Sequence, residues 1–306
     1  MQAKDLSFEH ENHVSAMQKI QELYDLEIIF PRMDLDEYVE IVSRNIKKEE
    51  LKHKDEWLKL NPENIISIPD IDIIKSTTTY KVLKDVSSEL KSNFKYIGGY
   101  LPAPYTLASL VMNLQISSEL VIFEPDFLKS VVKQSKKAII QYAETIKNFV
   151  DIFNILAPSE CTIMQRSYRE LVSEFMNEII SYCTNDLNKP CFIHFCSRKN
   201  KQIVNYDVVK PMKDAGLIGL NIPNIIEQID LAKELELILF GGIDPVKIQQ
   251  DPKELIIAQI KEMLTKTKDI KFILGTNCQV KWAPGQISSE GLLNIFKQIK
   301  NLLIKD

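Results

Sequence analysis

Glycine and long apolar stretches are both scarce in this sequence. Nine glycines occur among 306 residues, and none precedes Gly98. No apolar run approaches the roughly 18 residues that a membrane-spanning helix requires. The N-terminus has no basic segment followed by an apolar one, which a secretory signal would need. We therefore expect a cytoplasmic protein that makes no membrane contact.

Positive charge is not in excess either. Lysine and arginine total 38 against 42 aspartates and glutamates, so the formal net charge is −4. Proteins that bind nucleic acid by neutralising phosphates carry a basic surplus, and nucleic acid is therefore excluded as an expected partner. The hydrophobic share of 45% and the charged share of 26% are ordinary for a folded globular protein.

Cysteine is present in an odd number and only in the second half of the chain. The five cysteines are Cys161, Cys183, Cys191, Cys196 and Cys278. A chain of this length can bury a large core without covalent cross-links, so a disulfide framework is not expected. Cys161, Cys183 and Cys191 are assigned to packing, which leaves Cys196 and Cys278 for chemistry.

Short apolar runs alternate with segments whose apolar residues recur three and four positions apart. About eight runs read as strands buried on both faces, and several end in glycine, which we interpret as punctuation of strand ends. These runs are residues 26–30, 65–68, 96–100, 153–157, 191–196, 217–222, 237–241 and 271–275. The helical patterns cover residues 104–114, 125–149, 169–182, 208–214, 225–235, 252–264 and 288–303.

This alternation predicts a parallel sheet, and about eight units favour a closed (β/α)₈ TIM barrel over an open doubly wound sheet. The first 95 residues are less regular and contain charged helical stretches such as residues 34–60. We expect extra N-terminal helical segments there. No linker or repeat interrupts the chain, so residues 1–306 are expected to form a single barrel domain.

His194 and Cys196 are the residues that point most directly to chemistry. They stand two apart at the end of a predicted strand, so their side chains project to the same side. Cys278 follows the last predicted strand, and the carboxyl ends of barrel strands surround one mouth. One histidine and two cysteines form a zinc set with three protein ligands, the number typical of catalytic sites with an open position. The alternative is that these residues merely pack in the core.

Four segments resemble the methylcobalamin:coenzyme M methyltransferases of the uroporphyrinogen decarboxylase superfamily. The most specific is the strand 191–196 that ends in H-x-C, together with the late cysteine Cys278 and the closing helix at 288–295. Residues 102–108 resemble the family's G-P-x-T-L-A segment, and residues 241–245 resemble its G-N-x-D-P turn. The resemblance extends loosely over residues 95 to 303.

The resemblance implies that His194, Cys196 and Cys278 bind Zn²⁺ and act in catalysis. Zinc would activate a small thiol such as coenzyme M, which would accept a methyl group from methylcobalamin or from a methylated corrinoid carried by a partner protein. Coordination to a metal deprotonates a thiol whose ordinary pKa is about 8.5. Tyr105 and Asp244 fall in the matching segments, whereas Asn221 lies in the strand predicted at residues 217–222; all three are expected to contribute to cofactor binding.

The sequence also departs from the family pattern. Asn221 stands where members usually carry a carboxylate, Gly242 replaces the asparagine of the turn, and Ser197 and Arg198 replace a glycine beside H-x-C. Asp244 followed by proline has an alternative role as a helix cap, and Thr106 is expected to serve a helix start. Basic residues that could pair with an acidic acceptor flank the predicted ligands: Arg198, Lys199 and Lys281.

Three other functions stay open. A uroporphyrinogen decarboxylase-like enzyme would share the fold, but the arginine-rich R-Q-A-G-R loop of such enzymes is missing, and Phe30 is followed by Pro31 and Arg32. A methylcorrinoid:tetrahydrofolate methyltransferase would differ only in its acceptor. A barrel that binds a corrinoid or tetrapyrrole without turnover would need no metal.

Overall fold

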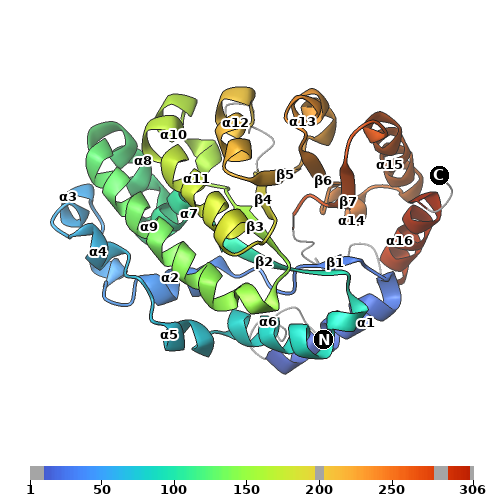
Figure 1. Cartoon of the computed structure of the whole chain (residues 1–306), viewed down its shortest axis with the longest axis horizontal. Helices are drawn as coiled ribbons and strands as arrows, with labels where there is room; N and C mark the ends of the chain where they lie inside the picture. Colours follow the sequence, from blue (N-terminus) through green and yellow to red (C-terminus); the bar gives the residue numbers. More distant parts are fainter. Residues whose placement is uncertain (1–9, 197–202, 279–288, 304–306) are drawn as a thin grey trace.

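Seven parallel strands form the centre of the protein. The computed structural model describes residues 10–196, 203–278 and 289–303. The strands pair in sequence order from β1 to β7, and helices cover the outer side of the curled sheet (Figure 1). This confirms the predicted TIM-barrel-like α/β fold. The strands are β1 (Ile28–Ile29), β2 (Tyr96–Pro102), β3 (Ile152–Leu156), β4 (Cys191–His194), β5 (Leu217–Ile222), β6 (Ile238–Ile243) and β7 (Phe272–Thr276).

Ring contacts show how far the sheet curls. Phe30, directly after β1, lies with its ring centroid 6.3 Å from that of Phe240 in β6. Phe240 also meets Phe192 of β4 at 6.0 Å, and Phe30 meets Tyr100 of β2 at 4.8 Å. Side chains from strands that are not neighbours therefore meet inside the curve, although no ladder joins β7 to β1 among the described residues.

The strand predicted at residues 65–68 is wrong. Ile65 is the last residue of a short helix, α4 (Pro62–Ile65), and Ile66 follows in an extended conformation; both are fully buried. Pro62 occupies the first turn, where its missing N–H costs nothing. A short apolar run has no periodicity that separates a buried strand from a buried helix end, which explains the error.

The expected N-terminal helical segments are present before β2. Asp34 caps the second of them by accepting a hydrogen bond from the backbone N–H of Glu37 (3.1 Å). The carboxylate of Glu37 in turn accepts from the backbone N–H groups of Thr78 and Thr79 at the start of the sixth. These helices are α1 (His10–Tyr24), α2 (Leu35–Val42), α3 (Lys54–Trp57), α4, α5 (Ile71–Ser76) and α6 (Thr78–Glu89).

The remaining helices follow the strands and lie outside the sheet. The longest, α9, begins at a proline and buries residues spaced three and four apart, as its sequence pattern predicts. They are α7 (Pro104–Met112), α8 (Leu114–Phe123), α9 (Pro125–Ile146), α10 (Gln165–Leu171), α11 (Ser173–Ser181), α12 (Tyr206–Asp214), α13 (Ile229–Glu234), α14 (Lys247–Gln250), α15 (Lys253–Thr267) and α16 (Ser289–Leu303).

Two apolar helices, α7 and α8, follow each other directly along the chain. Within the described ranges, no single helix is both long and apolar enough to cross a bilayer. The pair α7 and α8 meets the criterion when taken together, but it is bent by 113°. Nearly all of α7 is buried in the protein, as expected of a core helix.

Glycines inside the strands make room for the aromatic rings of the barrel interior, a role that strand-end punctuation does not describe. A Cβ at any of three strand glycines would lie within 2.5 Å of a ring atom of the paired phenylalanine. The pairs are Gly98 with Phe30, Gly219 with Phe192, and Gly275 with Phe240. Ring and glycine occupy complementary space, so the interior is packed and not a pore.

Candidate metal centre

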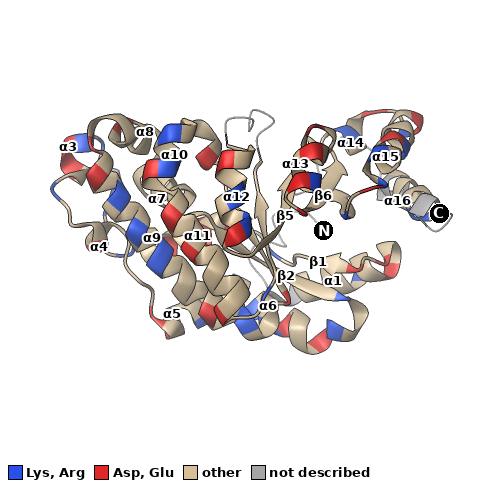
Figure 2. Cartoon of the chain, turned by 45° about the horizontal axis from the view of Figure 1, so that its top comes forward, with Lys and Arg blue, Asp and Glu red and all other residues tan. Residues whose placement is uncertain are grey.

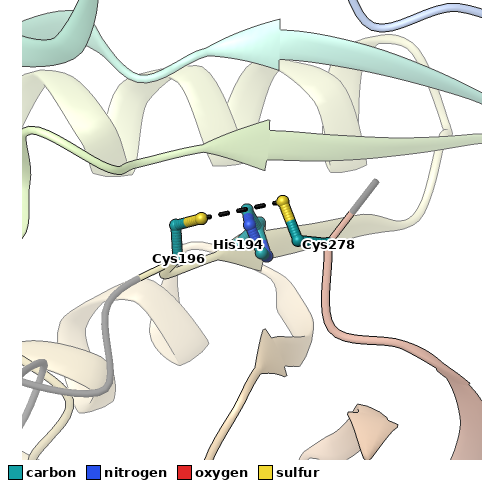
Figure 3. A group of neighbouring side chains, drawn as sticks. All are labelled: His194, Cys196 and Cys278. Atoms are coloured by element: carbon teal, nitrogen blue, oxygen red, sulfur yellow. Dashed lines mark hydrogen bonds between the residues drawn. The ribbon is translucent and has the colours of Figure 1, made fainter. Parts of the chain in front are cut away.

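His194, Cys196 and Cys278 come together at the carboxyl end of the barrel strands (Figure 3). One ligand atom from each lies within 4.8 Å of the others, and the two sulfurs are 3.7 Å apart. His194 ends β4 and is buried, whereas Cys196 follows two residues later and is exposed, with its sulfur close to that of Cys278. Cys278 arrives from the far side, two residues beyond β7. The structure thus assembles the three predicted ligands.

A backbone carbonyl orients the histidine ring. His194 is 4% exposed, and its Nδ1 lies 3.2 Å from the carbonyl oxygen of Asn221 on neighbouring β5. Because that hydrogen bond uses a protonated Nδ1, the other ring nitrogen, Nε2, is the one available to a metal. Metal-binding histidines are commonly held by such a bond to their second nitrogen.

The thiols of Cys196 and Cys278 are close enough that a bound cation would change how readily they ionise. The hydrogen bond with Cys278, and next burial, raise the pKa of the Cys196 thiol well above its usual range. Ionising one sulfur so close to another is unfavourable unless positive charge offsets it, and a coordinated metal ion supplies that charge. Two sulfurs and one imidazole nitrogen match the preference of zinc, and three ligands leave one position open.

Asn221 and Asp244 have structural partners. Besides its carbonyl, Asn221 uses its side-chain Nδ2 to donate to the carbonyl of Phe240 (3.3 Å). Asp244 Oδ1 accepts from the backbone N–H groups of Val246 (2.9 Å) and Lys247 (3.2 Å), which is the capping role left open above. Their contribution to cofactor binding stays a prediction.

Tyr105 is fully buried in α7, and its hydroxyl lies 3.5 Å from Ser117 Oγ in α8. A cofactor would reach this side chain only if the packing between α7 and α8 opened. Its predicted part in cofactor binding is therefore without support from its position, and it stays untested. Arg198, Lys199 and Lys281 lie outside the described residues.

Glu160 is a buried residue that the sequence analysis missed. It lies in the short 3-10 helix η4 (Glu160–Thr162) after β3 and accepts from the backbone N–H groups of Tyr105 (3.1 Å) and Thr106 (3.0 Å). The Thr106 hydroxyl donates to its second oxygen at 2.5 Å. Thr106 therefore serves the start of α7, as expected. Burial raises the pKa of Glu160 to about 7, although these hydrogen bonds act in the opposite direction.

Asn277 and Tyr100 were also missed, although both lie near Cys278. Asn277 directly precedes it, is 6% exposed and accepts from the backbone N–H of Gly242 at 2.5 Å. Burial, with a smaller effect from the charge of Cys278, raises the pKa of Tyr100. No spacing rule marks either residue, because each contact joins strands distant in sequence.

The other cysteines largely behave as expected. Cys183 and Cys191 are fully buried, so their assignment to packing is confirmed. Cys161 is only partly buried, and its Sγ lies 3.8 Å from the carbonyl oxygen of Ala157.

A comparison with protein families identifies the family of this chain. The family described as Uroporphyrinogen decarboxylase (URO-D) matches residues 53–285, which is most of the chain. The chain belongs to the uroporphyrinogen decarboxylase family. No curated protein matches it. Membership agrees with the superfamily that the sequence segments resemble.

Two solved structures share the fold of this uroporphyrinogen decarboxylase family member. A methyltransferase from Methanosarcina mazei superposes with a TM-score of 0.72 at 18% identity, covering 96% of this chain and 86% of that one. A B12-independent methionine synthase from Shewanella sp. W3-18-1, in complex with selenomethionine, gives a TM-score of 0.50 at 16% identity, covering 73% of this chain and 66% of that one. At such identities the likeness concerns the fold.

Proposed function

We propose that the protein is a zinc-dependent methyltransferase that transfers a methyl group from a methylated corrinoid to a thiol such as coenzyme M. The observation that carries this proposal is the cluster of His194, Cys196 and Cys278 at the barrel mouth, with ligand atoms within 4.8 Å. The fold shared with a methyltransferase and a methionine synthase supports it.

The residues of the site have distinct tasks in this reaction. Cys196 and Cys278 would hold the metal through sulfur, and His194 through the ring nitrogen that Asn221 leaves available. Bound zinc would lower the pKa of an acceptor thiol and so provide a thiolate at neutral pH. In the overall reaction the acceptor thiol would release its proton to solvent, and its sulfur–carbon bond would form as the cobalt–carbon bond of the methyl donor breaks, which would leave a Co(I) corrinoid.

The rim of the barrel mouth suits a protein that presents the corrinoid. Segments after four successive strands each expose an apolar residue at the same end as the metal cluster. These residues are Met164 (74% exposed), Tyr206 (42%), Ile226 (44%) and Val246 (53%). We propose that this apolar rim, defined by these four residues, receives a corrinoid protein whose methyl group then faces the site.

Family membership alone would also admit decarboxylation, and Arg32 argues against it. This arginine follows β1, but its side chain is only 8% exposed, and Nη2 lies 2.5 Å from the carboxylate of Asp34. Nη1 lies 3.4 Å from His13 Nε2. A positive charge that is already paired and buried offers little to the carboxylates of a tetrapyrrole. Decarboxylation would also leave the cysteine pair without a task.

Metal content and thiol methylation test the proposal together. Protein purified without added zinc is expected to hold about one zinc per chain by elemental analysis, and Cys278→Ser is expected to lose it. The intact protein should consume methylcobalamin in the presence of 2-mercaptoethanesulfonate. The absorbance change of the corrinoid measures the rate of this reaction. Cys278→Ser should reduce that rate by at least about a hundredfold, since a removed ligand costs the activated thiolate.

Cys183→Ser is the matched control, because it changes a buried cysteine away from the cluster. It should keep its zinc. The proposal would be contradicted if the intact protein bound no metal even after incubation with zinc. It would also be contradicted if Cys278→Ser kept its zinc as Cys183→Ser does.

A further inference from the structure

Cys278 is the ligand whose position local structure explains least. His194 and Cys196 are two residues apart at the end of β4. Cys278 instead lies two residues past the end of β7, and β5 and β6 separate β7 from β4 in the sheet. Within the described residues, the segment that leads into Cys278 joins its sulfur, 3.7 Å from that of Cys196, to the sheet.

Asn277 ties that segment to β6 twice. Its backbone N–H donates to the carbonyl of Ile243 (2.8 Å), which extends the ladder one residue past β7. Its side-chain Oδ1 accepts from the backbone N–H of Gly242 (2.5 Å). The side chain of Asn277 is only 6% exposed, so the residue next to Cys278 has little freedom to move.

Two glycines make the second tie possible. Gly241 and Gly242 have φ values of +132° and +97°, in a region that other residues rarely adopt. A Cβ on Gly241 would lie 2.7 Å from Asn277 Oδ1, and one on Gly242 would lie 2.1 Å from Met263 Sδ. The backbone is thus turned so that the N–H of Gly242 faces the amide, with no side chain between them.

We infer that Asn277 is a positioning residue that holds Cys278 beside His194 and Cys196 through its bond to the backbone of Gly242 in β6. This inference rests on the proposed function for its metal-binding consequence. Asn277 touches neither metal nor substrate; it acts through Cys278. Partners behind metal ligands typically change metal affinity by about 10- to 100-fold when they are removed.

Asn277→Ala tests this inference in the full-length protein. Its affinity for zinc, measured by competition with a chelator, should fall about 10- to 100-fold. In protein loaded with Co²⁺ instead, the sulfur-to-cobalt absorption should weaken, because one sulfur binds less regularly. Asn205→Ala is the control: Asn205 Oδ1 likewise accepts from a backbone N–H, that of Val208 at the start of α12, and its loss should leave zinc affinity unchanged.

A second measurement needs no metal. In metal-free protein the oxidant diamide should join Cys196 and Cys278, each sulfur losing one proton and one electron while diamide is reduced to its hydrazine. The rate at which this disulfide forms, measured by peptide mass spectrometry, should fall several-fold in Asn277→Ala. Gly241→Ala, which pushes on Asn277 from the other side, should act in the same direction.

These outcomes separate the two proposals. If intact protein binds no metal but the disulfide rate drops in Asn277→Ala, zinc-dependent methyl transfer fails and the positioning role stands. If Asn277→Ala matches the intact protein in disulfide rate and, where metal binds, in zinc affinity, the positioning role is overturned.

Discussion

Glu160 is a carboxyl group whose surroundings favour its neutral form. It is fully buried between the first turn of α7 and the segment after β3, and burial raises its pKa from 4.5 to about 7. Because the carboxyl group binds its proton more tightly in the folded protein, it stabilises the fold fully at pH values below its pKa in the unfolded chain. That contribution is lost as the pH rises from about 4.5 to about 7.

Glu160→Gln should therefore stabilise the protein at high pH. Glutamine keeps the size and an accepting oxygen for the N–H groups of Tyr105 and Thr106, but it cannot ionise. At about 1.4 kcal/mol per pKa unit, the variant should gain on the order of 3 kcal/mol relative to the intact protein between pH 4 and pH 8. Urea unfolding at a series of pH values measures this difference.

Glu124→Gln is the control for this measurement, because Glu124 is exposed between α8 and α9. Its unfolding free energy should follow that of the intact protein across the series. A constant difference between Glu160→Gln and the intact protein at all pH values would show that Glu160 does not titrate as its burial implies.

At the scale of the elements, the strands interlock through rings and glycines. Gly98 of β2 faces the ring of Phe30, and a Cβ there would lie 2.2 Å from Phe30 Cε1. Gly98 has no positive φ, so its backbone would accept another residue. The absence of a side chain at this position is therefore a packing requirement, since Phe30 also contacts Tyr100 and Phe240.

Gly98→Ala should lower the free energy of unfolding by about 1–3 kcal/mol, the usual cost of overpacking a core. Urea denaturation checks this. In a Phe30→Ala background the ring is absent, and the same Gly98→Ala change should cost less than about 1 kcal/mol. Equal losses in both backgrounds would mean that the ring is not what excludes a side chain at Gly98.

Element patterns were predictable where periodicity was long or punctuation was clear. The helix at α9 follows from 3.6-residue spacing over many turns, and six of the eight predicted strands before and after it overlap β2 to β7. Residues 26–30 contain β1, but only Ile28 and Ile29 pair in the sheet. Residues 65–68 failed because four apolar residues specify burial without specifying conformation.

At the scale of the whole molecule, charge is spread over the outer helices with both signs interspersed (Figure 2). The four exposed apolar residues of the rim instead follow the carboxyl ends of β3, β4, β5 and β6 along the chain. A partner that docks there would bury them at the barrel mouth where His194, Cys196 and Cys278 come together. Free methylcobalamin would not need all of these contacts.

The double variant Met164→Ser, Val246→Ser should raise KM for a methylated corrinoid protein by at least about tenfold, since two lost apolar contacts at roughly 1 kcal/mol each exceed 1.4 kcal/mol. With free methylcobalamin, steady-state kinetics should show little change. Leu255→Ser is the control, an exposed apolar residue on α15. An equal loss with both methyl donors would argue against docking at the apolar rim.

Features that depend on neighbours along the chain could be predicted before the structure was known. Alternating buried strands and amphipathic helices indicated the barrel, and the two-residue repeat of a strand placed His194 and Cys196 on one side. Contacts between distant segments became visible only in the folded protein: the 3.7 Å approach of Cys278 to Cys196, the bond of Asn277 to Gly242, and the bonds of Glu160 to the start of α7. These depend on how far the sheet curls, and curvature is set by packing among distant residues that no local pattern encodes.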